Sequence, residues 1–150
     1  MDGVRYEERL WAPAWMWVVA ALLTLTVGVA YGVPLGLQWG ALAFVIVGVG
    51  LAWLLIGSAT RIRVSSAGLA AGRALLPPTA IGDATPLDPE AAEALRGPKA
   101  DARAYLVLRG WVRTAVRVEV ADPADPAPYW YVSTRRPEEL AAALAEVRST

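Results

Sequence analysis

The chain has no cysteine and no histidine among its 150 residues. Without cysteine there can be no disulfide, no thiol nucleophile and no cysteine-ligated zinc or iron–sulfur site. Without histidine the chain lacks the commonest general base and the commonest metal ligand in proteins. These absences exclude several classes of enzyme and metalloprotein, and leave only an oxygen-ligated Mg²⁺ or Ca²⁺ site open in principle.

Charge is missing from one part of the chain. The formal net charge is zero, so no overall field favours nucleic acid or acidic partners, and we expect no nucleic-acid binding. Leu10 to Thr60, however, is a run of 51 residues without a charged side chain. A bilayer core of about 30 Å needs roughly 20 helical residues, and the glycine- and proline-containing stretch 32–36 breaks the run. We predict a transmembrane helical hairpin over residues 11–60, with helices at about 11–31 and 37–57.

Arginines flank the uncharged run but are absent from its central turn. Arg5 and Arg9 precede the run, and Arg61, Arg63 and Arg73 follow it. Because basic flanks stay in the cytoplasm, we expect both termini there, with residues 1–10 as a cytoplasmic N-terminal flank and the chain crossing the plasma (inner) membrane twice. The spans hold no acidic or basic side chain, which argues against a channel or a pump.

Small residues recur at a spacing of four within the two spans. They are Gly28 and Gly32 in the first span and Gly48 and Ala52 in the second. This spacing lets helices approach closely. Packing within the hairpin is the favoured explanation, and a homodimer through the same four residues is the alternative.

The pattern changes after Arg61 to that of a folded domain, residues 61–150. Alternating apolar residues and turn signals predict about six strands, over residues 61–65, 69–73, 81–87, 104–109, 114–120 and 129–133. Asp88 is a predicted N-cap for a short helix that ends near Arg96. Leu140, Ala143, Leu144 and Val147 form the apolar stripe of a C-terminal helix. The predicted class is α+β: a helical hairpin, then a small β-barrel or bent sheet with one inserted helix and a capping helix, an order similar to a pleckstrin-homology-like domain.

Three segments together carry a family resemblance. They are residues 5–11 (RYEERLW), residues 105–113 (YLVLRGWVR) and residues 121–140 (ADPADPAPYWYVSTRRPEEL). With them, the whole chain resembles domain of unknown function 3093, a family of small membrane proteins from high-GC, actinobacterial sources. The resemblance implies membrane location but no activity, and it supplies no catalytic residues.

Seven residues in three groups are candidates for contact with a partner or a lipid. Each group also has an ordinary structural explanation, which is the favoured one. Trp111, between Arg109 and Arg113, lies at a predicted hairpin tip and either enters the headgroup layer or closes the core. Tyr129 and Tyr131 either form a stacking surface or lie buried under a helix or loop. Arg135 and Arg136 either hold a phosphate or carboxylate before a helix, or are a solvated pair or form one salt bridge to Glu138 or Glu139.

Two further segments have alternative explanations. Asp122 and Asp125 are spaced like a metal or catalytic pair, but each precedes a proline, which is ordinary turn chemistry. Residues 5–9 either dock onto the following domain or form a solvated flank.

We therefore expect a non-enzymatic membrane protein with no cofactor and no metal. Its domain is expected to bind a partner, a protein first and an anionic lipid headgroup second. The third hypothesis is an enzyme with an unrecognised site. It is disfavoured because the sequence shows no nucleophile–base pair and no phosphate-binding loop.

Overall fold

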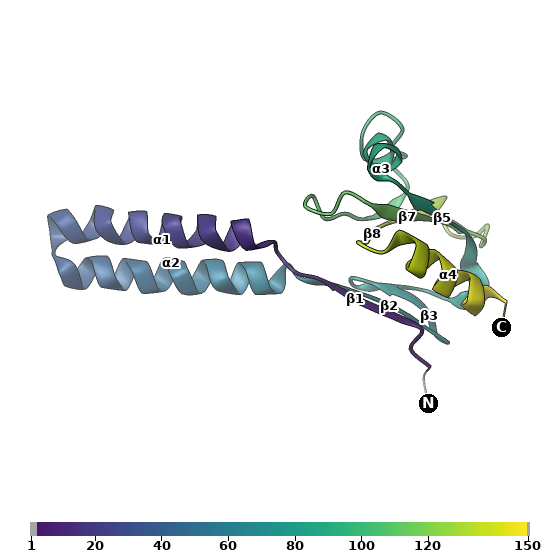
Figure 1. The fold of residues 1–150 in the computed structure, drawn as a ribbon, viewed down its shortest axis with the longest axis horizontal. Coiled ribbons are helices and arrows are strands. Elements are labelled where there is room, and N and C mark those ends of the chain that lie inside the picture. The colour runs from purple at the N-terminus through teal and green to yellow at the C-terminus, as the bar shows by residue number, and fades with distance from the viewer. Residues whose placement is uncertain (1–2, 150) are drawn as a thin grey trace. The chain divides into compact units, whose positions relative to one another are not determined.

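The computed structural model describes residues 3–149, which divide into two compact units. Residues 11–59 form one unit, a helical hairpin, and residues 3–10 together with 60–149 form the other, a domain of strands and helices (Figure 1). The chain therefore leaves the domain at Leu10 and re-enters it at Thr60. The predicted α+β class is confirmed at this level.

The hairpin consists of α1 (Ala14–Leu35) and α2 (Leu37–Gly57). Both helices are long and apolar enough to cross a membrane. The turn between them is a single residue, Gly36, whose φ of +102° suits glycine because it has no Cβ. The first helix thus continues past the predicted end at Tyr31 and contains Pro34 in its last turn.

Glycines, which have no Cβ, allow the two helices to pack close together. A Cβ on Gly40 would lie 2.6 Å from both the Gly28 carbonyl oxygen and the Gly32 Cα, and a Cβ on Gly48 would lie 3.2 Å from the Thr24 methyl group. Packing within the hairpin, the favoured explanation for the small residues, is therefore confirmed for Gly28, Gly32 and Gly48. A homodimer through these residues and Ala52 stays a prediction.

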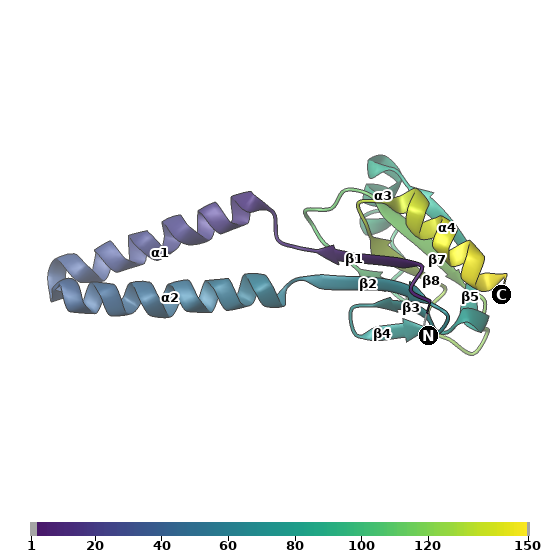
Figure 2. The same ribbon diagram turned by 60° about the horizontal axis from the view of Figure 1, so that its bottom comes forward.

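The first sheet of the domain has four antiparallel strands in the order β1-β2-β3-β4 (Figure 2). They are β1 (Tyr6–Leu10), β2 (Thr60–Ser65), β3 (Gly68–Ala71) and β4 (Ala74–Leu76). Residues 6–10, expected as a flank, form an edge strand that pairs with β2 from Tyr6↔Val64 to Leu10↔Thr60. Of the two alternatives for residues 5–9, docking onto the domain is the one confirmed.

The second sheet has the order β5-β7-β8-β6. A 3-10 turn (Pro78–Ala80) leads into β5 (Ile81–Leu87), followed by α3 (Pro89–Arg96), β6 (Tyr105–Val107), β7 (Ala115–Val120), β8 (Tyr129–Ser133) and α4 (Pro137–Arg148). Asp88 caps α3 as predicted, accepting a hydrogen bond from the Ala91 N–H at 2.8 Å.

Two predictions about the sheets are wrong. About six strands in one small barrel or bent sheet are predicted, but residues 3–149 contain eight strands in two four-stranded sheets, and these described residues form no closed barrel. The strand β6 also does not form a hairpin with β7, because it pairs in parallel with β8. Gly110 and Trp111 therefore lie in a connection between non-adjacent strands rather than at a hairpin tip.

One apolar core joins the two sheets and α4. The predicted stripe of α4 is buried in this core, together with inward-facing residues of both sheets, among them Ile62, Val64, Val116 and Val118. A second, smaller cluster lies under α3 and includes Leu87, Ala92, Tyr129 and Tyr131. The sheets and α4 thus depend on each other for burial of their apolar faces.

Candidate functional site

Tyr129 and Tyr131 lie on the opposite face of β8 from Trp130, as strand alternation requires. Trp130 belongs to the main core, whereas both tyrosines belong to the cluster under α3 and are at most 5% exposed. Burial raises the pKa of the Tyr131 hydroxyl above its ordinary value. Burial beneath a helix, the favoured explanation for the two tyrosines, is confirmed.

Trp111 is half-buried and packs against the main core. The guanidinium carbon of Arg109 lies 6.0 Å from the centre of its ring, and the Arg109 backbone N–H donates to the Ser133 hydroxyl at 3.1 Å. Arg113 is exposed. The structure therefore holds Arg109 and Trp111 against the domain and leaves Arg113 on the surface.

Arg136 immediately precedes α4 and forms an ion pair with Glu139 at 2.9 Å. Its guanidinium also donates to the Glu7 carbonyl at 3.2 Å and lies over the ring of Tyr6, 5.0 Å from the centroid. The salt-bridge explanation is thus confirmed for Arg136. Arg135 is exposed, and its backbone N–H donates to Glu8 at 3.2 Å.

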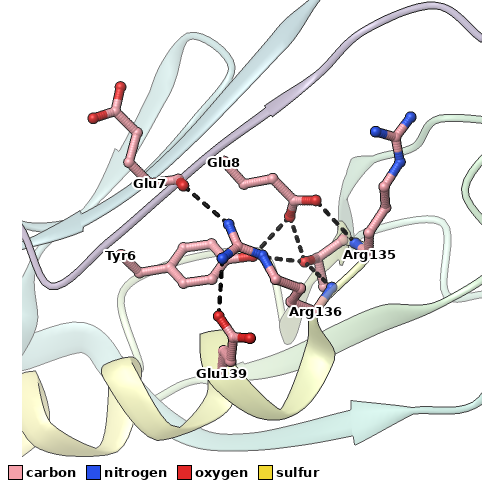
Figure 3. Close-up of polar contacts among 7 residues, drawn as sticks. Tyr6, Glu7, Glu8, Arg135, Arg136 and Glu139 are labelled. Carbon is pink, nitrogen blue, oxygen red and sulfur yellow. Dashed lines mark hydrogen bonds and ion pairs between the residues drawn. The ribbon is translucent and has the colours of Figure 1, made fainter.

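These contacts belong to a polar cluster that sequence reasoning did not find (Figure 3). Glu8, on β1, is only 8% exposed, and Thr134, immediately after β8, is fully buried. The Tyr6 hydroxyl donates to Glu8 Oε2 at 2.7 Å, and the Thr134 hydroxyl donates to the same oxygen at 2.6 Å. We call Tyr6, Glu8, Thr134 and the Arg135 N–H the Glu8 cluster.

The Glu8 cluster ties the N-terminal strand to the junction of β8 and α4. The oxygens of Tyr6 and Thr134 also lie 2.9 Å apart, and Thr134 accepts a hydrogen bond from the Arg136 N–H at 3.1 Å. Burial raises the pKa of Tyr6 to about 12, with the Thr134 hydrogen bond acting in the opposite direction and Glu8 adding to the rise. A buried carboxylate is costly unless it is hydrogen-bonded, and here both of its oxygens have donors.

The geometry of the Glu8 cluster is that of a structural contact between β1 and the junction of β8 and α4. A general base needs an acceptor within reach of a substrate proton, but both Glu8 oxygens accept hydrogen bonds from the protein and the side chain is buried. The burial of β1 alternates with period two, with Tyr6, Glu8 and Leu10 facing inward, but the sequence shows no such alternation because Glu8 is charged like Glu7 and Arg9. No local signal marks Thr134.

The two candidate acids Asp122 and Asp125 lie in the loop before β8. Each carboxylate accepts a hydrogen bond from the backbone N–H two residues further on, at 2.9 Å for Asp122 and 2.8 Å for Asp125. These are side-chain-capped turns. The turn explanation for this pair is confirmed.

The structure thus defines a class of protein: an apolar helical hairpin inserted between two paired strands of a two-sheet domain. The chain belongs to the family of proteins of unknown function DUF3093, whose model matches residues 5–144. Comparison with curated proteins and with solved structures gave no match. The pleckstrin-homology-like likeness and the actinobacterial source stay predictions.

Proposed function

We propose that the chain is an integral membrane protein whose hairpin crosses the bilayer twice. The helices have 22 and 21 residues, which at 1.5 Å per residue span about 30 Å, the thickness of a hydrocarbon core. In the most apolar 18-residue stretch of each helix, only 6% and 11% of the stretch is buried. Large apolar side chains such as Leu22 and Ile46 are about 60% exposed. Helices of a soluble core would be covered, so lipid is the solvent that suits these surfaces.

The insertion of the hairpin between β1 and β2 carries the proposed topology. Leu10 and Thr60 are paired neighbours in one sheet, so the folded domain requires the chain to leave and return on the same side of the membrane. The flanking arginines favour the cytoplasmic side of the plasma (inner) membrane for that domain and for both termini. Only the short turn at Gly36 would then face outward.

Cysteine accessibility tests this topology directly, because the chain has no cysteine of its own. We expect Gln38→Cys, beside the turn, to react with a membrane-impermeant maleimide in intact cells. Ser149→Cys should react only after the cells are permeabilised. Labelling of Ser149→Cys in intact cells, or extraction of the protein by alkaline carbonate, would refute the proposal.

We further propose that the domain is a non-enzymatic binding module for a protein partner. Two observations support this. Both oxygens of the buried Glu8 carboxylate accept hydrogen bonds from the protein, and β6 is an edge strand that carries a side chain 42% exposed, Leu106. An exposed strand edge can accept a strand from another chain, with pockets for alternate side chains giving specificity.

Photo-crosslinking in cells tests the partner proposal. A photoreactive residue at Leu106 should crosslink one defined protein, and the same residue at Leu75, which is 56% exposed on the edge strand of the other sheet, is the matched control. Equal or absent crosslinking at both positions would contradict a binding site at β6. Substitution of Tyr129 or Tyr131 is unsuitable here because both side chains are buried, and the change would test folding instead.

A further inference from the structure

The first sheet carries a basic patch, made of two residues on the outer face of β2 and one in the β3–β4 turn, that no candidate site includes. We propose that Arg61, Arg63 and Arg73 bind the phosphate headgroups of anionic lipids at the membrane surface. This inference rests on the proposed membrane insertion. It differs from the lipid contact considered for Trp111, which lies on another part of the domain.

The strand β2 separates its side chains cleanly between two faces. Ile62 and Val64 are fully buried in the core, whereas Arg61 and Arg63 are exposed. Arg73 is exposed in the β3–β4 turn, and the preceding Gly72 N–H donates to the Arg61 carbonyl at 3.2 Å. The turn is therefore held beside Arg61, at the end of the sheet where the chain enters and leaves the hairpin.

The patch has an excess of positive charge. Arg61 lies directly opposite Arg9 on β1, and Arg63 lies opposite Glu7. Like charges directly opposite each other destabilise a sheet. Within residues 3–149, Arg61, Arg63 and Arg73 form no ion pair, whereas Arg136 and Arg148 each pair with a carboxylate. An anion at the patch would offset this repulsion, and guanidinium groups suit phosphate oxygens because they donate paired hydrogen bonds.

The chain length to the hairpin identifies the source of the phosphate. Arg61 follows the last residue of α2, Gly57, by four residues, so its Cα lies within about 14 Å of the helix end along the chain. The headgroup layer extends roughly 5–8 Å beyond the hydrocarbon on each side, and an arginine side chain can reach back toward it. Trp11 and Trp15, exposed at the start of the hairpin, are residues that favour the same layer.

Lipid selectivity of the full chain tests the inference. The protein is reconstituted into vesicles of equal parts phosphatidylcholine and phosphatidylglycerol, and the association of spin-labelled phosphatidylglycerol is compared with that of spin-labelled phosphatidylcholine. We expect a preference for phosphatidylglycerol that falls about fivefold for each arginine removed in R61Q/R63Q, the factor corresponding to about 1 kcal/mol per basic residue at an anionic surface. The charge-retaining R61K/R63K should keep most of the preference.

The matched control is K99Q/R103Q, which removes the same charge from exposed positions after α3 and should leave the preference unchanged. An unchanged preference in R61Q/R63Q, or a loss that occurs equally in the control, would overturn the inference. So would a loss confined to R109Q/R113Q, which would move lipid binding to the Trp111 segment. Displacement of the lipid by an equal concentration of soluble glycerol phosphate would instead identify a soluble ligand and also overturn it.

Two measurements separate this inference from the proposed membrane insertion. Flotation of the native chain with pure phosphatidylcholine vesicles reports insertion alone. If flotation fails, the proposed function fails. If flotation succeeds without lipid preference, only the basic patch is refuted. Circular dichroism of each variant in the vesicles confirms that the fold is retained, and R61K/R63K provides the comparison if R61Q/R63Q does not fold.

Discussion

The Glu8 cluster should determine how firmly β1 is held in the first sheet. In Glu8→Ala, the Tyr6 hydroxyl, the Thr134 hydroxyl and the Arg135 N–H all lose their acceptor. The two hydroxyls lie 2.9 Å apart, so one can donate to the other. This leaves one hydroxyl and one N–H unsatisfied, at about 1–3 kcal/mol each. With water entering part of the vacated space, we expect a destabilisation of about 3 kcal/mol.

Graded variants separate the hydrogen bonds from the charge. In Glu8→Gln the amide oxygen can still accept from the Arg135 N–H, and the amide nitrogen can donate to the Tyr6 and Thr134 oxygens. We therefore expect a loss of only about 1 kcal/mol, the difference between a charge-assisted and a neutral hydrogen bond. Glu7→Ala is the matched control, because Glu7 lies on the same strand but is exposed, and it should change stability by less than about 0.5 kcal/mol.

Amide hydrogen exchange of the full chain in detergent micelles measures these changes locally. A loss of about 3 kcal/mol should accelerate exchange in residues 6–10 roughly a hundredfold in Glu8→Ala. The helices α1 and α2 should keep their protection in every variant and thus serve as an internal reference. If Glu8→Ala exchanges no faster than Glu7→Ala, the Glu8 cluster does not hold the strand and the reasoning fails.

Three further predictions concern pH, helix packing and the hairpin insertion. The pKa of the Tyr6 phenol is near 10 in the unfolded chain and about 12 in the folded chain. The stability that the neutral phenol gives the folded state is therefore fully present below pH 10. It should be lost as the pH rises from about 10 to 12, amounting to about 2–3 kcal/mol in urea unfolding, and Tyr6→Phe should lack this pH dependence. Gly40→Ala places a Cβ 2.6 Å from the backbone of α1 and should force the helices apart at a cost of about 1–3 kcal/mol, measured by the distance between spin labels on the two helices. Gly50→Ala, with nothing within 4 Å, should not. Finally, joining Leu10 to Thr60 through a two-residue asparagine–glycine turn should give a soluble domain with cooperative unfolding by circular dichroism, whereas a chain that starts at residue 61 lacks β1 and should aggregate.

Features that depend on neighbouring residues could be predicted from the sequence. The uncharged run predicted two apolar helices, the Asp88–Pro89 pair predicted the start of α3, and the stripe from Leu140 to Val147 predicted the buried face of α4. Each of these signals lies within one continuous stretch of the sequence, so it can be recognised without knowing the rest of the fold.

Features that depend on distant partners could not be predicted. Glu8 resembles any surface carboxylate until it is known that Thr134 faces it, 126 residues later in the chain. Likewise, β7 lies between β5 and β8, whereas β6, the strand that directly precedes β7 in the chain, pairs in parallel with β8 instead. The strand β4 has only three residues, too few for a period to be visible.

The position of the hairpin between β1 and β2 also sets an order for biosynthesis. Tyr6 and Glu8 leave the ribosome first, but β2, the neighbour of their strand, follows only after the whole hairpin. Thr134 emerges another 126 residues after Glu8, on the order of ten seconds later at ordinary elongation rates. Until β2 emerges the N-terminal segment has no strand partner, so in the proposed topology both helices can enter the membrane before the first sheet forms. In the proposed topology, pairing of β1 with β2 therefore takes place only after both helices have been inserted and the chain has returned to the side on which it began.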